Sequence, residues 1–380
     1  MNHYDVVIVG GGPVGAALAL ELHAAGLRIV LLEAREQSAA ATGLRPLALS
    51  YGSRLILERM GVWESLSGAT PIAGIHVSQR GRFGRALLSA DEAGLPALGY
   101  VTDYATLVET LEAAVNRAGL PVLRGARVTS LAHDMSSARL TFASAAGPGE
   151  CIASLVVIAD GSALAADVEV RTTDYRQSAV TAIVQTELAH RNTAYERFTP
   201  EGPIALLPFA QQCALVWTVN AADGEALSRA TPQAFLARLS DRFGERLGRF
   251  IEVGPRAAHH LTLRVAERTT SGRAVLIGNA AQALHPVAGQ GFNLGLRDAW
   301  ELATELRRRT PDDPQLAAAY RARRRLDRHG GIAFTDALVR VFSNDLAGLG
   351  VARGAGLALL DSFPPAKDFV TRRMVFGSSG

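Results

Sequence analysis

The sequence YDVVIVGGGPVG, residues 4–15, decides the fold of the N-terminal part of the chain. Its first half, Tyr4–Val9, is a short apolar run rich in β-branched residues, which is typical of a parallel strand buried on both faces. The glycines that follow, Gly10, Gly12 and Gly15, have the spacing G-x-G-x-x-G. In that pattern the first glycine permits a tight turn, the second lets the backbone approach a pyrophosphate, and the third lets a helix pack closely on the strand. The stretch therefore predicts a Rossmann-like unit that binds a dinucleotide.

The residues after this stretch complete the predicted unit. A helix of small residues is expected over residues 16–25, and a second strand over residues 28–32 that ends at Glu33. A carboxylate at this position accepts hydrogen bonds from ribose hydroxyls. Because the same carboxylate would repel a 2′-phosphate, FAD or NAD fits this site and NADP does not.

Two later segments are expected to reach the same ligand. A buried strand over residues 152–159 ends in Asp160 and Gly161, and ligands of open α/β sheets bind at the carboxyl ends of strands. Arg45 lies in an otherwise apolar loop that leads into a helix predicted over residues 53–60. We expect Arg45 to contact a phosphate or the edge of a flavin; the alternative is an ordinary surface arginine.

The stretch GNAAQALHPVAGQGFNLGLRD, residues 278–298, predicts the other half of the ligand site. It follows an apolar run, Ala274–Ile277, and apolar residues recur at helical spacing after Gly291, which indicates a strand, a short helix, a glycine-rich loop and a long helix. A helix that begins after Gly289-Gln290-Gly291 points free N–H groups and its positive end towards a negatively charged partner. A reduced flavin carries negative charge near N1 and O2, so this helix end suits a flavin ring. The alternative is a tight strand-to-helix turn inside a core.

The composition excludes several classes of protein. The chain has 380 residues, 48% of them hydrophobic and 20% charged, which is typical of a folded globular protein with room for two domains. A net charge of +3 gives no electrostatic case for nucleic acid. Cys151 and Cys213 are too few for a disulfide framework or a metal cage, and both are expected to be buried free thiols in a reducing compartment. His259-His260 lacks metal-ligand spacing, so no metal site is expected. No signal peptide and no apolar run of membrane-spanning length is expected.

The middle of the chain predicts a second, mainly antiparallel β-sheet. Strand-like runs lie between residues 176 and 265, with a helix predicted over residues 231–243, and the block has no glycine-rich phosphate loop. We expect this sheet to form one wall of a cavity with no polar catalytic side chain in it. The predicted substrate-pocket residues are Leu206, Pro208, Trp217 and Pro286. Gly147-Pro148-Gly149 is predicted to be a turn.

The chain beyond residue 314 is predicted to be mainly helical. Five arginines cluster on one predicted helix, where they are expected to form a solvated face or, alternatively, a patch for a membrane surface or a partner. An apolar stripe at helical spacing follows on the same helix and is expected to belong to a core. The arginines are Arg321, Arg323, Arg324, Arg325 and Arg328, and the stripe is Phe334, Leu338, Val341 and Phe342.

Taken together, the three loops resemble those of the single-component FAD-dependent aromatic hydroxylases of the para-hydroxybenzoate hydroxylase fold. Among these the chain is most similar to the ubiquinone-biosynthesis hydroxylases, and the resemblance covers nearly the whole chain. The expected fold is α/β, with a Rossmann-like FAD-binding domain interleaved with a mainly antiparallel β-sheet substrate domain and a C-terminal helical segment. The further shared stretches are RPLAL at 45–49, HVSQRG at 76–81, ERFT at 196–199 and GPIALLP at 202–208. The expected ranges are 1–70, 101–175 and 266–330 for the FAD-binding domain, 71–100 and 176–265 for the substrate domain, and 331–380 for the helical segment.

The resemblance also implies roles for individual residues. It implies that Glu33 holds the adenosine ribose, Arg45 contacts FAD, Val128 meets the adenine through its backbone and Asn279 contacts the ribityl chain. His285-Pro286 is expected to belong to the loop that shapes the ring pocket, with proton transfer as the alternative role. The residues implied to line the flavin ring are Gly289, Gln290, Gly291, Phe292 and Asn293.

The resemblance implies an activity as well. NAD(P)H would reduce FAD, O2 would form a C4a-hydroperoxide, and a hydroxyl group would be transferred to an electron-rich polyprenylated phenol, 2-polyprenyl-6-methoxyphenol. The alternatives are another ring position, a soluble aromatic substrate, or a non-catalytic flavoprotein subunit. The implied setting is cytoplasmic, with peripheral contact to the inner membrane face and with other ubiquinone-biosynthesis proteins as further expectations.

The sequence departs from the family pattern at two places. Gly278-Asn279 stands where the family usually has Gly-Asp, and an asparagine can still hydrogen-bond a ribityl hydroxyl. Residues 163–168 supply neither the serine nor the arginine that usually follows the Asp160-Gly161 pair, which leaves the choice between NADH and NADPH open.

Overall fold

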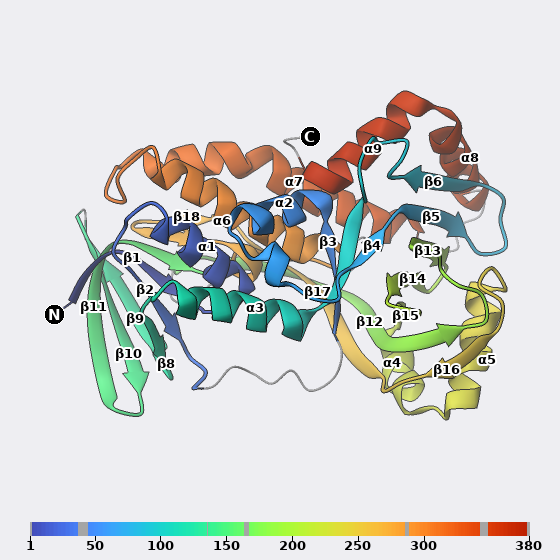
Figure 1. Ribbon diagram of the computed structural model, residues 1–380, viewed down its shortest axis with the longest axis horizontal. Coiled ribbons are helices and arrows are strands. Elements are labelled where there is room, and N and C mark those ends of the chain that lie inside the picture. Colours follow the sequence, from blue (N-terminus) through green and yellow to red (C-terminus); the bar gives the residue numbers. More distant parts are fainter. Residues whose placement is uncertain are drawn as a thin grey trace.

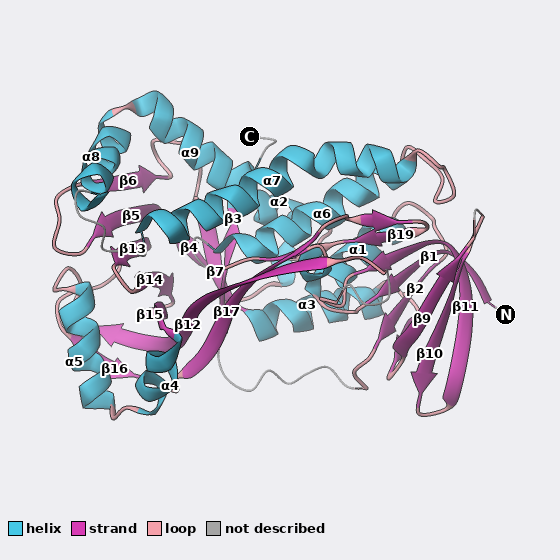
Figure 2. Ribbon diagram, turned by 180° about the vertical axis from the view of Figure 1, so that it is seen from behind, coloured by secondary structure: helices cyan, strands magenta, loops and turns pink. Residues whose placement is uncertain are grey.

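The computed structural model describes residues 2–36, 45–134, 136–162, 167–285, 289–342 and 349–377. Two large sheets lie towards opposite ends of the molecule, and the long strands β12 (Val170–Thr186) and β17 (Ala257–Ala266) run between them (Figures 1 and 2). The arrangement is the expected α/β fold with a C-terminal helical segment. The residue ranges of the domains stay a prediction.

The first sheet carries the parallel strands predicted from the opening stretch. β1 pairs in parallel with β2 and with β11, and β11 pairs in parallel with β19. Because these strands run the same way, the segments that follow them all leave from one edge of the sheet. The strands of this sheet are β1 (Asn2–Val9), β2 (Ile29–Glu33), β8 (Val122–Arg124), β9 (Arg127–His133), β10 (Ala138–Ser144), β11 (Gly147–Ile158), β18 (Thr270–Ser271) and β19 (Ala274–Leu276).

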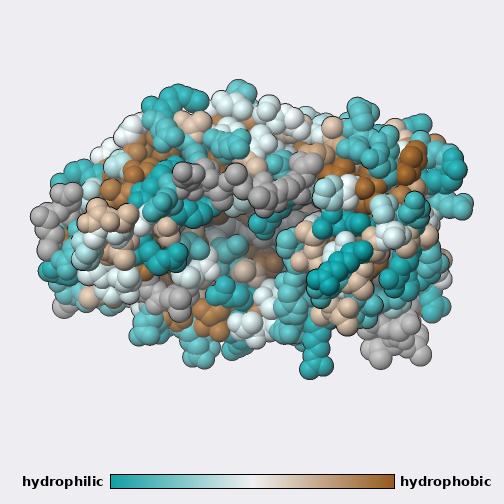
Figure 3. Space-filling model, turned by 90° about the horizontal axis from the view of Figure 1, so that it is seen from below, coloured by the Kyte–Doolittle hydropathy of each residue, from teal (hydrophilic) through white to brown (hydrophobic). Residues whose placement is uncertain are grey.

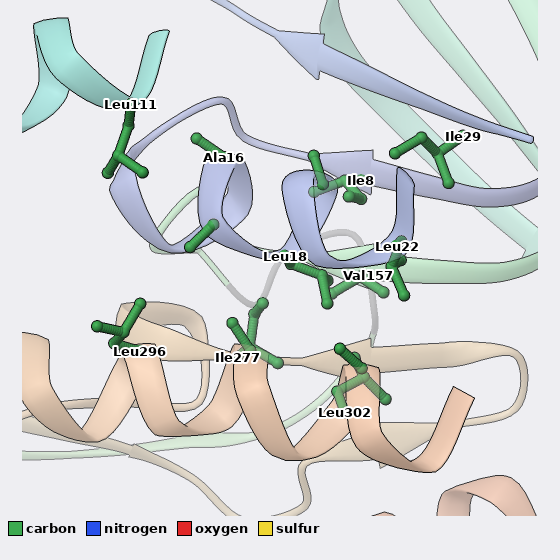
Figure 4. Packing of buried hydrophobic residues seen from close by; sticks show 14 of the residues in the cluster. Ile8, Ala16, Leu18, Leu22, Ile29, Leu111, Val157, Ile277, Leu296 and Leu302 are labelled. Atoms are coloured by element: carbon green, nitrogen blue, oxygen red, sulfur yellow. The ribbon is translucent and has the colours of Figure 1, made fainter. Parts of the chain in front are cut away.

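Helices α1 (Pro13–His23) and α6 (Gln290–Leu306) cover one face of this sheet. Figure 4 shows Ile8 of β1, Leu18 of α1 and Leu302 of α6 packed in one apolar cluster, and all three are fully buried. Burial of each such side chain contributes about 1.5–3 kcal/mol to folding. This core therefore fixes the two glycine-rich segments, which precede α1 and α6, relative to each other.

The second sheet is mainly antiparallel, as predicted, although β13 pairs in parallel with β5. One of its faces is covered by α4 (Ala221–Arg229) and α5 (Pro232–Phe243), whose apolar residues form a separate core with the sheet. Besides β12 and β17, its strands are β5 (Gly74–Gln79), β6 (Arg85–Ser89), β13 (Thr193–Thr199), β14 (Gly202–Phe209), β15 (Gln212–Asn220), β16 (Phe250–Val253) and β20 (Gln282–Ala283).

A small third sheet, two further α-helices and one short 3₁₀ element stand beside the two large sheets. The small sheet pairs β3 (Pro46–Ser50) and β4 (Thr70–Ile72) with β7 (Gly99–Asp103), all antiparallel. Helix α2 (Tyr51–Arg59) follows β3, a 3₁₀ turn η1 (Trp63–Ser65) follows α2, and α3 (Tyr104–Arg117) follows β7.

The C-terminal helical segment consists of α7 (Leu316–Phe342), α8 (Leu349–Ser362) and α9 (Pro364–Phe376). Figure 1 shows α7 running along the top of the molecule from the first sheet towards the second. Two glycines, Gly330 and Gly331, lie in the middle of α7, where an added Cβ at residue 330 would collide with the guanidinium of Arg373. Among the described residues, no helix is long and apolar enough to cross a membrane.

Two predictions from the sequence are wrong in detail. Gly147-Pro148-Gly149 is not a turn but the start of β11, where Gly147 pairs with Ser144 of β10. The five arginines of α7 do not form a solvated face or a membrane patch as a group, because Arg324 and Arg328 are only 3% and 8% exposed. The physical reason is that both find buried polar partners on neighbouring elements. Cys151 and Cys213 are buried free thiols, as predicted.

Candidate active site

One continuous cavity of about 1800 Å³ joins the two ends of the molecule. A site for one drug-sized ligand has a volume of roughly 300–1,000 Å³, so this cavity has room for a cofactor and a second molecule. It begins at the loop after β1, passes the segment after β19 and ends between the second sheet and helices α7, α8 and α9. The space-filling view from below shows the surface hollowed between the two ends of the molecule, with hydrophobic residues in the hollow (Figure 3).

The loop after β1 is shaped for close contact with a ligand. Gly10 has a φ of +106°, and a Cβ added there would lie 2.6 Å from the backbone nitrogen of Asp160. A Cβ at Gly15 would overlap the Gly10 carbonyl oxygen, so the third glycine lets α1 pack against the turn. Gly12 faces open space, with no atom within 4 Å of an added Cβ. A bare backbone N–H that opens onto a cavity at a helix N-terminus is what a pyrophosphate needs.

Glu33 closes the side of this loop. Its carboxylate is buried and accepts hydrogen bonds from the Gly11 backbone nitrogen at 2.8 Å and from the backbone nitrogen and Nε of Arg35, each at 2.9 Å. Burial acts to raise the pKa of Glu33, but the hydrogen bonds and charge of Arg35 outweigh it, so that the pKa is lowered. The ionised carboxylate is therefore fixed beside the cavity. Arg35 also lines the cavity and was not predicted as a site residue.

Arg45 and Val128 both line the cavity, as expected for contacts with a bound dinucleotide. The backbone nitrogen of Arg45 donates to Asp103 Oδ1 at 2.8 Å, and its guanidinium lies 4.9 Å from the centre of the Tyr104 ring. Val128 belongs to β9, which pairs with β10 on the first sheet.

The segments that follow β11 and β19 meet at the cavity. Asp160 and Gly161 follow β11, and an added Cβ at Gly161 would lie 3.7 Å from Cβ of Asn279. The Asp160 carboxylate accepts from the backbone nitrogen of Ser162 at 2.8 Å and from its hydroxyl at 2.9 Å. Asn279 is exposed to the cavity, while Gly278 lies against Val14 of α1. All four predicted residues thus share one place in the structure.

The N-terminus of α6 faces the same cavity, but only some of its residues line the cavity, and the others are buried against neighbouring elements. Gly289, with a φ of +60°, precedes the helix and lines the cavity together with Gly291 and Phe292. Gln290 and Asn293 are buried and do not line it. Asn293 Oδ1 instead accepts hydrogen bonds from the Ser50 backbone nitrogen at 2.8 Å and the Ser53 hydroxyl at 2.7 Å. Asn293 therefore ties α6 to the junction of β3 and α2.

A buried ionic network, which the sequence did not predict, binds the segment that follows β19 through hydrogen bonds to Gly278 and Gln282. Asp298 accepts from the Gly278 backbone nitrogen at 3.0 Å, from Gln282 Nε2 at 2.7 Å and from Arg324 Nε at 2.7 Å. Arg328 Nε donates to Gln282 Oε1 at 3.0 Å. Asp327 joins Arg297 to this group, because its carboxylate lies 2.8 Å from Arg297 Nε and 2.7 Å from Arg324 Nη1. We call the six side chains the Asp298 network: Gln282, Arg297, Asp298, Arg324, Asp327 and Arg328. The only signal in the sequence is an acid at the end of the glycine-rich stretch followed by arginines on the next helix.

His285 lies at the boundary between the two ends of the cavity. It is 1% exposed, and its ring packs edge-on against Tyr175, with 5.3 Å between the ring centres. Burial lowers the pKa of His285 to about 4, so the imidazole is neutral at pH 7. A neutral, fixed ring agrees with a role in shaping the pocket. Pro286, the other predicted residue here, lies outside the described residues.

The predicted substrate-pocket residues of the second sheet are on the wrong face. Leu206 and Trp217 are buried in the core with α5, where the ring centres of Trp217 and Phe235 lie 5.6 Å apart. Pro208 lies two residues after Leu206 on β14 and therefore faces the same side of the sheet. The residues that line the cavity are their neighbours Ala205, Leu207 and Val216. Because side chains alternate across a sheet, a shift of one residue exchanges the two faces.

The cavity wall also carries a polar side chain, Glu196, although the sequence predicted a wall without one. Glu196 of β13 lines the cavity on the same sheet face as Ala205. Its Oε1 is enclosed and makes no hydrogen bond with the described residues, and burial raises the pKa of the carboxyl to about 7. The signal was present as a charge between Ala194 and Phe198 on an otherwise apolar strand face.

The C-terminal helices complete the apolar end of the cavity. The predicted stripe on α7 lines it with Phe334, Leu338 and Val341, while α8 contributes Leu357 and Leu360. These side chains face a cavity rather than a closed core. They extend the site well beyond the space near the glycine-rich loops.

The described residues fit a flavin dinucleotide. An open glycine turn, a fixed carboxylate beside it and the N-terminus of α6 stand around one cavity, where they suit a pyrophosphate, a ribose and the negatively charged edge of a reduced flavin.

Comparison with known proteins gives the same picture. The family described as "FAD binding domain" matches residues 3–329. Ubiquinone hydroxylase UbiL of Rhodospirillum rubrum is 36% identical over 97% of this chain and 88% of that protein. The 3-demethoxyubiquinol 3-hydroxylase of Escherichia coli is 30% identical over 93% of each chain. Among solved structures, p-nitrophenol 4-monooxygenase PnpA of Pseudomonas putida has the same fold, with a TM-score of 0.80, 18% identity and full coverage of both chains.

Proposed function

Because the chain belongs to the FAD-binding monooxygenase family, and thus uses FAD with NAD(P)H as donor, we propose that it hydroxylates the ring of a polyprenylated phenol in ubiquinone biosynthesis. The observation that carries the proposal is the shape of the cavity. One end is polar and suits a dinucleotide, and the other is a long apolar space between the second sheet and α7, α8 and α9. Apart from Tyr195, Glu196 and Arg353, the walls of this end are mainly apolar, which suits a prenyl chain.

The proposed substrate is 2-polyprenyl-6-methoxyphenol. A relative named for 3-hydroxylation of 3-demethoxyubiquinol supports a second candidate, hydroxylation at another position of the same class of ring. Both substrates combine a phenolic ring with an apolar tail, so the apolar end of the cavity suits them equally.

The cofactor, when bound, supplies the electrons from NAD(P)H and the activation of O2 that the side chains themselves cannot supply. The protein binds and orients the reactants. We propose that Arg45, Asp160, Gly161 and Gly278 contact the cofactor, with Asn279 at its ribityl chain and Gly289, Gly291 and Phe292 at its ring. In the same proposal Gly10, Gly12 and Gly15 surround the pyrophosphate, Glu33 the ribose and Val128 the adenine. The apolar walls exclude water from the reacting ring.

A complementation experiment tests the proposed function. This chain is expressed in bacterial strains that each lack one ubiquinone ring hydroxylase, and the lipid-soluble intermediates are profiled. Rescue of the strain that accumulates 2-polyprenyl-6-methoxyphenol is the expected result. Rescue of only the strain that accumulates a 3-demethoxy intermediate selects the second candidate. A non-catalytic flavoprotein would be favoured by two results together. The chain would rescue none of the strains, and the purified yellow protein would show no increase in NAD(P)H oxidation with any polyprenylated phenol.

The setting of the enzyme is part of the same proposal. A polyprenylated substrate partitions into lipid, so we propose that the protein makes peripheral contact with the cytoplasmic face of the membrane and works beside other ubiquinone-biosynthesis proteins. Co-sedimentation of the purified protein with vesicles, with and without substrate, measures the first part.

A further inference from the structure

We propose that Glu196 receives the phenolic hydroxyl of the substrate and accepts its proton while the ring is hydroxylated. This inference rests on the proposed function, because it requires a substrate with a phenolic O–H. It assigns a substrate-contacting residue on the sheet wall of the cavity.

The position of Glu196 follows from the register of four strands. Glu196 on β13 pairs with Val77 on β5 and with Ala205 on β14, and Ala205 pairs with Val216 on β15. Residues paired in register point to the same face of a sheet, and all four line the cavity. The row continues to Thr181 on β12, which also lines it. A single carboxyl therefore stands in a row of small or apolar side chains that leaves space above it.

The carboxyl of Glu196 has no partner in the described part of the chain. Neither oxygen makes a hydrogen bond or an ion pair with a described residue, and Oε1 is fully enclosed. Its neighbour Arg197 points to the other face of the sheet, where it lines a different pocket. A buried polar atom without a partner costs about 1–3 kcal/mol and needs an explanation. Oε2 is not enclosed, so it is the oxygen of this carboxyl that a ligand such as a phenol can reach and donate a hydrogen bond to.

The surroundings of Glu196 keep its carboxyl basic. The cavity-facing residues of the adjoining strands are apolar, and α7 presents Phe334 and Leu338 towards the cavity. The titratable side chains that line this end are Tyr195 of β13 and Arg353 of α8, with His285, His259 and His260 nearer the first sheet. Burial raises the pKa of Glu196 to about 7. A carboxylate with that pKa is a far better proton acceptor at neutral pH than an exposed one, whose pKa is about 4.3.

The proton balance of the proposed step is closed. In the complete reaction a ring C–H, O2, NAD(P)H and a proton give a ring C–OH, water and NAD(P)⁺. As the new C–O bond forms, electron density leaves the ring and the phenolic O–H becomes strongly acidic, so its proton passes to the Glu196 carboxylate. When the ring carbon loses its own proton and aromaticity returns, the proton held by Glu196 goes back to the phenolic oxygen. Glu196 is thus regenerated in each turnover.

Glu196→Gln is the main test, because the amide keeps the size and the hydrogen bond but cannot accept the proton. Its kcat for a short-chain 2-prenylphenol is expected to fall about 100-fold, the usual contribution of a general base, with KM changed much less. The wild-type kcat/KM is expected to rise with pH through about 7, and this rise should disappear in the variant. The matched control is Glu252→Gln, an exposed position on β16 of the same sheet, which should behave like the wild type.

A second variant keeps the test decisive if Glu196→Gln folds poorly. Glu196→Asp retains a carboxyl, so the rise with pH should persist at a lower kcat. The proposal is overturned if Glu196→Gln stays within threefold of the wild type and keeps the rise, or if Glu196→Asp loses the rise while its bound FAD spectrum is normal. Failure of the wild-type protein to hydroxylate any prenylated phenol would overturn the proposed function itself, which separates the two failures.

Discussion

Each end of the cavity is lined by one glutamate carboxyl, and the surroundings of the two carboxyls differ. Glu33 accepts hydrogen bonds from Gly11 and Arg35, and its pKa is lowered. Glu196 has no partner among the described residues, and its pKa is raised to about 7. The first is saturated before any ligand arrives, which suits a cofactor that stays. The second is left incomplete, which suits a substrate that enters, exchanges a proton and leaves.

The largest expected effect concerns the saturated end. Asp298→Ala leaves Arg324 in a buried position with half of its counter-charge removed, so we expect a loss of about 3–5 kcal/mol in the free energy of unfolding. The loss of its bond to the Gly278 nitrogen should also weaken FAD binding. Urea denaturation monitored by circular dichroism, together with FAD titration, measures both.

The control for this change is Asp241→Ala, which removes an exposed ion pair with Arg80. Such pairs contribute about 0–1 kcal/mol. Equal effects of the two substitutions would show that the Asp298 network is not the support of the glycine-rich segment that its hydrogen bonds indicate.

The next effect concerns Glu196, where a substitution is expected to raise the free energy of unfolding and not to lower it. The pKa of Glu196 in the folded protein, about 7, lies above the ordinary value of 4.5 expected for the unfolded chain, so the folded state binds the proton more tightly. Stability from this group is present below pH 4.5 and is lost as pH rises to about 7. Glu196→Gln should therefore raise the free energy of unfolding by up to about 3 kcal/mol at pH 8.5 and hardly at all at pH 4.5. Thermal unfolding at the two pH values measures the difference.

A variant that is more stable and less active marks a group kept for function at a cost in stability. If Glu196→Gln were instead less stable at every pH, the carboxyl would be a structural group with a partner, and the contrast with Glu33 would fail.

A smaller effect is expected at Glu33. Glu33→Gln removes the charge that holds Arg35 and one of the two oxygens that fix Gly11 and Arg35 beside the cavity, so FAD affinity should fall about 10- to 100-fold, or about 1.4–3 kcal/mol. Because the pKa of Glu33 is lowered, wild-type FAD affinity should show no loss from this group between pH 8 and pH 5. Fluorescence titration of FAD over that range checks both statements. An affinity that falls steeply below pH 7 would contradict the assignment of a fixed carboxylate.

The smallest effect is expected for Asn279→Asp. Both side chains can accept a hydrogen bond from a ribityl hydroxyl, and the position is exposed to the cavity, so FAD affinity should change less than about threefold. Rescue of the complemented strain by this variant would show that asparagine is tolerated variation at this position. Loss of rescue with FAD still bound would show that the amide has a role in the reaction.

The sequence predicted the saturated end well because its signals are local. One short stretch of sequence contains Gly10, Gly12 and Gly15, and Glu33 ends the strand that follows α1. The glycine-rich stretch before α6 is likewise one continuous piece of sequence. The other end depends on registers between strands that are distant in the sequence. Leu206 and Trp217 were assigned to the cavity, and a difference of one residue placed them in the core beside α5.

The arginines of α7 show the same limit. From one helix alone, Arg324 and Arg328 look like part of a charged surface, although Asp327, three residues after Arg324, is one buried partner of Arg324. The other partners come from earlier in the chain: Gln282 of β20 precedes the loop before α6, and Asp298 follows it, within α6. A long-range contact of this kind is decided by tertiary packing and has no local pattern.

The pair of glycines within α7 has a mechanical consequence. A 27-residue helix is about 40 Å long, and this one holds the Asp298 network with its first half and lines the apolar end of the cavity with its second. Gly330 and Gly331 lie between the two halves, and each glycine weakens a helix interior by roughly 0.5–1 kcal/mol relative to alanine. At Gly330 the missing Cβ leaves room for the guanidinium of Arg373 on α9, which donates to the Leu326 carbonyl oxygen of α7. The midpoint of α7 is thus where α9 is attached, between the half that carries the Asp298 network and the half that lines the cavity.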